Sequence, residues 1–272
     1  MTQPTDKPIL YLGDTSLSNA AGYLAGLMSF FRLGYDYVPS SVAVNGEAER
    51  PRALYVISDY SAKQMTDPIQ RDVVRRVERG AGLLMIGGWE SYHGLGGDWD
   101  GTPIGQILPV RISRDDDRVN CDQPALVRKV QSHPIVDDLP WDERPPTIGG
   151  FNRFAAKSDG QVLLDVQRFA ARRATGTDEM HFRATGRDPL LVVGRHGRGR
   201  VVSLATDLAP HWSGGMVDWG DGPRVTAAAP ESWEIEVGSC YAKFVRQLLA
   251  WTGQLEAGSA PTRADTVLAA HG

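Results

Sequence analysis

Cysteine is the scarcest informative residue in this chain, with two copies, Cys121 and Cys240, among 272 residues. Two cysteines far apart in the sequence exclude a disulfide framework and a cysteine-based zinc site. Cys240 lies in a segment of helical period, so we expect a small buried core residue there. Cys121 lies in a polar segment and is expected to be a surface thiol.

Long apolar runs and an excess of basic residues are also missing. No apolar stretch reaches the roughly 18 residues that a membrane span needs, and the polar N-terminus lacks a signal-peptide core. The net charge is -4 and the pI is near 5.9, which argues against binding to nucleic acid or to an anionic membrane. With 42% hydrophobic residues the chain can bury a large core, and we expect a cytoplasmic globular protein.

The first part of the chain alternates short apolar runs with helical patterns. The expected strands cover 9–13, 35–38, 53–57 and 83–86, and the expected helices 19–31 and 68–79. Such a succession is typical of a parallel sheet with right-handed crossovers and helices on both faces. Asp14, Ser16 and Ser18 are candidates to cap the first helix.

The middle, from Val110 to about Thr185, is less regular and is rich in Pro, Asp and Arg. It predicts short antiparallel strands and long loops, with strands at 162–166 and 190–193. A hairpin turn over 194–199 leads to a strand at 200–205, and a final helix covers about 239–251. We expect a single domain over residues 1–254 and a flexible tail over 255–272.

The most informative segment is 82–94, in which an apolar run ends in Gly87 and Gly88 and polar or aromatic side chains follow at once. Polar residues also follow three other expected strands. In a parallel sheet these strand ends lie on one edge, where small molecules bind. The sequence therefore predicts a small-molecule site there, with these candidate binding residues: Asp14, Asp59, Gly87, Gly88, Trp89, His93, Asp207 and Trp212.

Three residues at this edge are candidates for catalysis, each with a plainer alternative. Glu90, beside Trp89, is a candidate general acid or base, or an acceptor for nearby backbone N–H groups. Ser91 is a candidate nucleophile if a histidine lies in reach, or a capping serine. His211 is a candidate acid or base oriented by a carboxylate, or a loop histidine packed on Trp212.

A divalent metal site built from His93, His211, Asp14 and Asp207 has no support from histidine spacing, so no metal is predicted. The glycine-containing segments 94–97 and 197–199 do not match a phosphate-binding loop. The sequence identifies no cofactor.

Several segments, taken in order, resemble the glutamine-amidotransferase-like proteins of the class I glutamine amidotransferase superfamily, close to the ThuA-like group. The matching segments are residues 20–26, 79–94, 102–110, 133–141, 149–152, 197–201 and 207–212. This resemblance implies a flavodoxin-like fold, a three-layer α/β/α sandwich with a mostly parallel sheet, to which the middle adds an irregular β-rich insertion.

The resemblance also implies where a nucleophile would lie. Active members carry a cysteine in a Gly-x-Cys-x-Gly turn between strand and helix, because a thiolate attacks an amide carbon readily. The corresponding turn here is Gly87-Gly88-Trp89-Glu90-Ser91, which places Trp89 or Glu90 at the nucleophile position. We therefore do not expect this chain to release ammonia from glutamine by the usual route.

Two hypotheses follow. The first is a hydrolase-type enzyme acting on a small polar substrate, with Glu90 and His211 as acid and base, Ser91 as nucleophile and the Gly87 and Gly88 amides as an oxyanion site. The second is a non-catalytic ligand-binding or assembly module on the same fold. The sequence leaves open whether the chain forms a homo-oligomer, in which the irregular middle would supply contacts between subunits.

Overall fold

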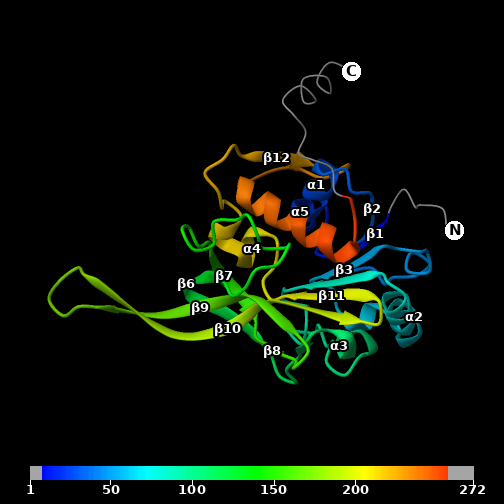
Figure 1. The fold of residues 1–272 in the computed structure, drawn as a ribbon, viewed down its shortest axis with the longest axis horizontal. Coiled ribbons are helices and arrows are strands. Elements are labelled where there is room, and N and C mark those ends of the chain that lie inside the picture. Colours follow the sequence, from blue (N-terminus) through cyan, green and yellow to red (C-terminus); the bar gives the residue numbers. More distant parts are fainter. Residues whose placement is uncertain (1–7, 257–272) are drawn as a thin grey trace, which may run out of the picture.

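The protein is built around a nine-stranded sheet with the order β2-β1-β3-β4-β11-β10-β9-β6-β7 (Figure 1). The computed structural model describes residues 8–256, so most of the predicted tail lies outside the described residues. Strands β1 to β4 and β11 are parallel, and the others are antiparallel. The parallel strands are β1 (Ile9–Gly13), β2 (Tyr35–Val38), β3 (Leu54–Ser58), β4 (Gly82–Ile86) and β11 (Gly199–Leu204).

Helices cover both faces of the parallel half. The helices α1 (Ala21–Phe30) and α5 (Ser239–Gly253) lie on one face, and α2 (Asp67–Glu78) and α3 (Pro103–Ile107) lie on the other (Figure 1). Every residue of β1, β3 and β4 is buried, as expected for parallel strands covered on both sides. The predicted α/β class and its flavodoxin-like layers are confirmed.

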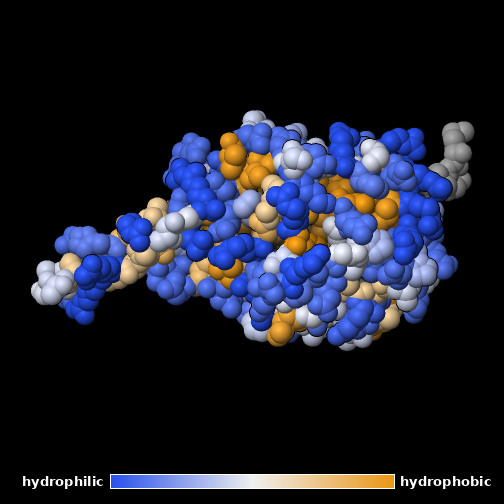
Figure 2. All heavy atoms as spheres, turned by 90° about the horizontal axis from the view of Figure 1, so that it is seen from below, coloured by the Kyte–Doolittle hydropathy of each residue, from blue (hydrophilic) through white to orange (hydrophobic). Residues whose placement is uncertain are grey.

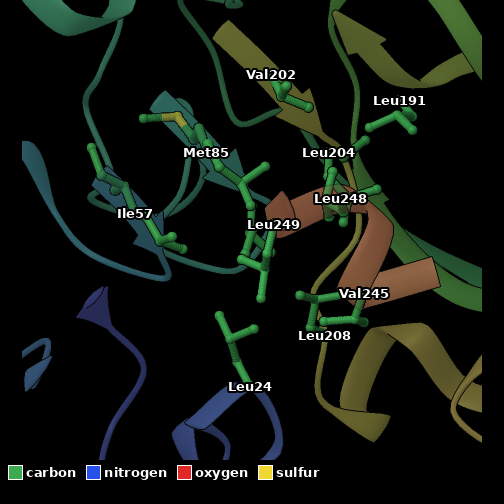
Figure 3. Packing of buried hydrophobic residues seen from close by; sticks show 14 of the residues in the cluster. Leu24, Ile57, Met85, Leu191, Val202, Leu204, Leu208, Val245, Leu248 and Leu249 are labelled. Carbon is green, nitrogen blue, oxygen red and sulfur yellow. The ribbon is translucent and has the colours of Figure 1, made fainter. Parts of the chain in front are cut away.

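The core lies on both faces of the sheet, and a large part of it lies between the sheet and α5. Val245, Leu248 and Leu249 of α5 belong to the same buried cluster as Ile57 of β3 and Leu204 of β11, and Figure 3 shows Leu248 beside Leu204. Full burial of each such side chain stabilises the fold by roughly 1.5–3 kcal/mol. These contacts hold α5 against the strands whose carboxyl ends form the edge described below.

The irregular middle differs from the expectation of short strands and long loops. It forms long antiparallel strands that extend the same sheet, so the sheet is mixed. These strands are β6 (Arg118–Lys129), β7 (Thr147–Asn152), β9 (Gln161–Arg173) and β10 (Met180–His196). Register shifts in β10 near Gly186 and Pro189 break the alternation of polar and apolar residues that identifies a strand in a sequence.

Small elements complete the molecule. Two short antiparallel pairs lie outside the main sheet: β5 (Val110–Arg111) with β8 (Ala155–Ala156), and β12 (Val225–Ala228) with β13 (Glu234–Val237). Three single-turn helices are η1 (Ala62–Gln64), α4 (Pro210–Ser213) and η2 (Gly214–Met216). Within residues 8–256, no helix combines the length and apolarity needed to cross a bilayer.

Two local expectations are corrected. No side chain caps α1, whose N-cap position is Ala20, because Asp14 is buried and its carboxylate accepts a hydrogen bond from Tyr11 instead. Both cysteines are partly buried, so Cys240 is not a fully buried core residue and Cys121 is not a fully exposed thiol.

Gly87, directly after β4, lies close against the backbone of Ala205, directly after β11. A Cβ at this position would lie 2.0 Å from the backbone oxygen of Ala205. Gly87→Ala is therefore expected to lower the free energy of unfolding by at least about 2 kcal/mol through overpacking. Gly46→Ala is the matched control, because a Cβ there meets no atom within 4 Å. Urea denaturation measures both, and equal stability of the two variants would contradict this close approach.

Candidate functional site

The carboxyl ends of β1, β3, β4 and β11 lie along one edge of the sheet, as predicted. The strand order reverses between β1 and β3, which is the kind of switch point where α/β sheets bind ligands. Asp14 follows β1 and Asp59 follows β3, so these two carboxylates flank the switch point. Asp207 follows β11, and, beyond the effect of its burial, the charges of Asp14 and Asp59 both raise its pKa.

Both flanking aspartates have left-handed backbone conformations. The φ angle is 51° at Asp14 and 47° at Asp59. Residues other than glycine adopt this region at an energetic cost, and such residues cluster at functional sites. The conformation turns each chain sharply as it leaves its strand.

The turn after β4 is held by the Asp59 side chain and by Ser91. The Asp59 carboxylate accepts a hydrogen bond from the backbone N–H of Glu90. The backbone N–H of Asp59 donates to Ser91 Oγ at 2.9 Å, and Ser91 Oγ donates to the carbonyl of Ile86 at 2.6 Å. Ser91 is fully buried, and its hydroxyl makes both bonds with backbone groups. In this arrangement the Ser91 hydroxyl holds the turn and reaches no histidine of the described chain, and its predicted role as a nucleophile stays a prediction.

Asn152, at the end of β7, binds the same turn from the other side. Its Oδ1 accepts from the N–H of Gly88 at 2.9 Å, and its Nδ2 donates to the Gly88 carbonyl at 3.1 Å and to Asp117 at 2.8 Å. The N–H of Gly87 donates to the carbonyl of Thr206 at 3.2 Å. Both glycine N–H groups therefore already have acceptors within the protein, and the predicted oxyanion site stays a prediction.

Sequence reasoning missed Asp117 and the role of Asn152. Asp117 accepts hydrogen bonds from the backbone N–H groups of His93 and Gly94, at 3.0 and 3.1 Å. Asn152 lies in a segment that carries the family resemblance, but nothing local indicates that its amide reaches β4. Asp117 lies in an acidic run that resembles a solvated loop, and no sequence signal distinguishes it from its neighbours.

Trp89 and His211 form the exposed part of the edge. Trp89 is 40% exposed, and its indole N–H donates to His211 Nε2 at 3.1 Å. In this geometry the proton of the neutral imidazole lies on Nδ1. The Arg118 guanidinium lies over the Trp89 ring, 4.4 Å from its centroid, which is a cation–π contact.

The three aspartates share a poorly solvated environment. Burial raises the pKa of Asp14 to about 7, and the charge of Asp59 adds to this while the hydrogen bond from Tyr11 opposes it. Burial also raises the pKa of Asp59 and, strongly, that of Asp207. Asp207 accepts hydrogen bonds from the N–H groups of Trp212 and Ser213, at 3.2 and 2.8 Å, which anchor α4. The cluster can therefore hold protons near neutral pH.

Glu90 lies half-buried beside this cluster. Partial burial raises the pKa of its carboxyl, the nearby Asp59 raises it further, and Lys63 lowers it. A raised pKa suits a group that exchanges a proton with a ligand. The geometry of Glu90 is compatible with the predicted acid–base role.

Two predicted binding residues lie away from this exposed group. The His93 ring pairs with Asp100 at 2.8 Å through Nδ1. Trp212 is buried, its indole N–H donates to Asn120 at 2.9 Å, and its side chain fills the space beside Gly150. The Trp212 side chain is thus part of the packed interior, and its predicted contact with a ligand stays a prediction. Within residues 8–256, no three His, Cys, Asp or Glu side chains are arranged to hold a metal ion.

The layered sheet and its strand-edge turn define an α/β protein of the amidotransferase-like class, with no cysteine in the turn. The chain belongs to the family described as "Putative glutamine amidotransferase", whose family model matches residues 53–227. The resemblance inferred from the sequence is thus confirmed.

Solved structures show the same fold. Cytoplasmic Protein STM3548 from Salmonella typhimurium is 20% identical with a TM-score of 0.67, and Cytoplasmic Protein STM1381 from Salmonella typhimurium LT2 is 23% identical with a TM-score of 0.66. Each comparison covers 90% of this chain and 98% of the other. A ThuA-like protein from Parabacteroides merdae is 11% identical with a TM-score of 0.57, covering 94% of this chain and 92% of that one. No curated protein matches the chain significantly.

The pKa of Asp14 predicts a pH-dependent stability. The unfolded chain releases this proton near pH 3.8, whereas the folded protein keeps it to about pH 7. Between these values the folded state binds more protons, so the free energy of unfolding falls as pH rises and levels off above about 7, by on the order of 4 kcal/mol. Asp14→Asn, which keeps an oxygen acceptor for Tyr11, is expected to remove the Asp14 part of this slope and to leave the parts that come from the raised pKa values of Asp59 and Asp207.

Urea denaturation of both proteins from pH 4 to pH 8 measures the difference. Asp115→Asn, at an exposed position, is the control and is expected to leave the slope unchanged. If wild type and Asp14→Asn lose stability in parallel as pH rises, Asp14 does not hold this proton.

Proposed function

We propose that this chain binds a small polar molecule at the carboxyl edge of its parallel strands, with Trp89, Glu90 and His211 as the contacting groups. One observation carries the proposal: the turn at which active amidotransferases hold their cysteine presents Trp89 and Glu90 to solvent, while the other groups of the turn are tied into the fold. The buried Ser91 hydroxyl and the glycine amides are already hydrogen-bonded. The side chains of the turn that remain exposed can bind a ligand, but they do not include a nucleophile.

The chemistry of the edge indicates the class of ligand. Asp59 and Glu90 favour a molecule that donates hydrogen bonds from hydroxyl, amide or ammonium groups. Trp89 offers an exposed aromatic face, on which sugar rings and cations pack. We therefore infer a neutral or cationic ligand such as a sugar derivative, an amide or an amine. We also propose a cytoplasmic location, since two proteins of the same fold are named cytoplasmic proteins.

A second candidate function is hydrolysis of the same ligand class without a covalent intermediate. The raised pKa of Glu90 favours it, because a carboxylic acid that keeps its proton closer to neutral pH can act as a general acid. His211, close enough to Asp59 for their charges to interact, is the candidate base, and it takes up a proton once its Nε2 is released from the Trp89 indole N–H.

A thermal-shift screen of sugars, amides and amines tests the site. We expect at least one compound to raise Tm, and we expect Trp89→Ala to weaken its binding about tenfold or more. Glu90→Gln and His211→Ala separate the two functions. If wild type turns the compound over and the variants bind it without turnover, the protein is an enzyme. If wild type binds the compound but does not turn it over, the protein is a binding protein. Glu49→Gln, at an exposed position elsewhere, is the control. A ligand whose binding survives all three substitutions would place the site elsewhere.

A glutaminase assay tests the loss of amidotransferase chemistry. With no cysteine in the turn after β4, we expect no ammonia release above that of a Cys121→Ser, Cys240→Ser double variant. Robust release that disappears in the double variant would show that one of the two cysteines acts as a nucleophile from outside the turn.

A further inference from the structure

A second polar cleft lies at the opposite end of the sheet from the candidate site. The turn between β10 and β11 is at the amino end of β11, whereas Asp207 follows the carboxyl end of the same strand. At this amino end α5 packs against β11 (Figure 1). Beside the contact is a cleft of about 460 Å³, the α5 cleft, whose lining includes His133, Asp159, Arg195 and Trp251. Its volume is within the range of small-molecule sites.

Two arginines lie side by side at the α5 cleft. Arg195 of β10 and Arg200 of β11 are direct cross-strand partners, so their side chains are on the same face of the sheet. Like charges in directly paired positions destabilise a sheet. Within residues 8–256, neither arginine forms an ion pair with a carboxylate. Burial lowers the pKa of Arg200, and the charge of Arg195 lowers it further, so the two positive charges repel each other.

Arg200 is held in place, whereas Arg195 is exposed. The Arg200 guanidinium lies over the Trp251 ring, 4.6 Å from its centroid, and its Nη1 donates to the Trp251 carbonyl near the end of α5. Arg195 is exposed and lines the cleft. Arg200 therefore supplies a fixed positive charge, and Arg195 supplies N–H donors that can reach a ligand.

His133 adds a hydrogen-bond donor to the cleft. Its Nδ1 accepts from the backbone N–H of Ile135 at 3.2 Å, so the neutral ring carries its proton on Nε2. Burial lowers the pKa of His133, while Asp137 opposes this and Arg200 adds to it, which keeps the ring neutral at pH 7. In the part of the chain that the structure describes, Nε2 has no hydrogen-bond partner. The ring packs edge-on against Trp251, with 4.6 Å between the centroids, so this donor is positioned.

We propose that the α5 cleft binds a small molecule with one oxyanion group, a carboxylate or a phosphate, held by Arg195 and by the Nε2–H of His133. Guanidinium groups bind both kinds of oxyanion through paired hydrogen bonds. An anion at this position also offsets the repulsion between Arg195 and Arg200, which a neutral ligand would not do. Trp251 supplies an apolar surface for the rest of the ligand. This site does not depend on the ligand proposed for the carboxyl edge, where buried carboxylates disfavour an anion.

A small molecule suits the α5 cleft better than a macromolecule does. The chain has a net charge of -4, which opposes binding to nucleic acid or an anionic membrane, and two arginines provide few phosphate contacts. Figure 2 shows a face of the molecule that is mostly hydrophilic, with hydrophobic residues in separate groups. A large protein interface is marked instead by a continuous apolar patch.

Isothermal titration calorimetry of the full chain with inorganic phosphate and with acetate, at low ionic strength and near neutral pH, tests the proposal. We expect at least one of the two anions to bind with a dissociation constant of about 1 mM or lower. Arg195→Gln is expected to weaken this binding at least about tenfold, because it removes a charged hydrogen-bond donor. Asp159→Asn is expected to tighten it about threefold, because it removes a negative charge from the cleft. The anion that binds more tightly identifies the charged group of the ligand.

Arg198→Gln is the matched control. Arg198 is exposed in the same hairpin turn and does not line the cleft, so this variant removes an equal charge and is expected to keep the affinity within about twofold. An equal loss of affinity in Arg195→Gln and Arg198→Gln would show a general attraction by charge and overturn the proposal. So would a lack of binding of both anions to wild type up to about 20 mM.

Thermal unfolding gives an independent readout. Without phosphate or acetate, Arg195→Gln is expected to raise Tm, because it removes one of two charges that repel each other across the strands. The anion that binds is expected to raise the Tm of wild type and to leave that of Arg195→Gln unchanged. If Arg195→Gln unfolds at a lower temperature than wild type, the charge of Arg195 is already balanced within the protein and the proposal fails.

Discussion

The arrangement of the candidate site depends on the side-chain amide of Asn152. This buried amide holds both backbone groups of Gly88, at the start of the turn after β4, and also binds Asp117, which holds the next part of the same loop. A buried polar group left without a partner costs about 1–3 kcal/mol. Because moving the turn would break several of these hydrogen bonds at once, the bonds hold the turn in essentially one position. It also joins the antiparallel half of the sheet, through β7, to the parallel half. The outward position of Trp89 and Glu90 follows from it.

The fold changes the protonation of the carboxylates at this edge, which the residue types alone do not define. Asp14 and Asp59 leave their strands in left-handed conformations and lie close enough to Asp207 for all three charges to interact. In water each would be ionised at neutral pH, but burial favours the protonated forms. The edge therefore combines hydrogen-bonding groups and stored protons with an exposed indole. Relatives that carry out glutaminase chemistry depend instead on a cysteine in the turn, which this chain lacks.

The parallel half of the fold could be predicted because its signals are local. Strands such as β3 and β4 are buried on both faces and read as unbroken apolar runs between helices of regular period. The antiparallel half could not be predicted in the same way. The outer parts of β9 and β10 are exposed, so their residues are polar and resemble a loop, and the bulges near Gly186 and Pro189 interrupt the alternation. Their pairing depends on residues that are distant in the sequence.

The sequence by itself determined the α/β class, the edge of the sheet at which polar residues follow the strands, the family resemblance and the absence of a cysteine from the turn. Each of these depends on residue type and short-range order. Only the tertiary structure decided which residues face the solvent there: it buried Ser91 and Trp212, engaged the glycine amides, paired His93 with Asp100 and brought His211 to Trp89. The physical reason is that burial and hydrogen-bond partners are set by contacts between distant segments. A polar residue after a strand has the same sequence signature whether its side chain points to a ligand or into the backbone.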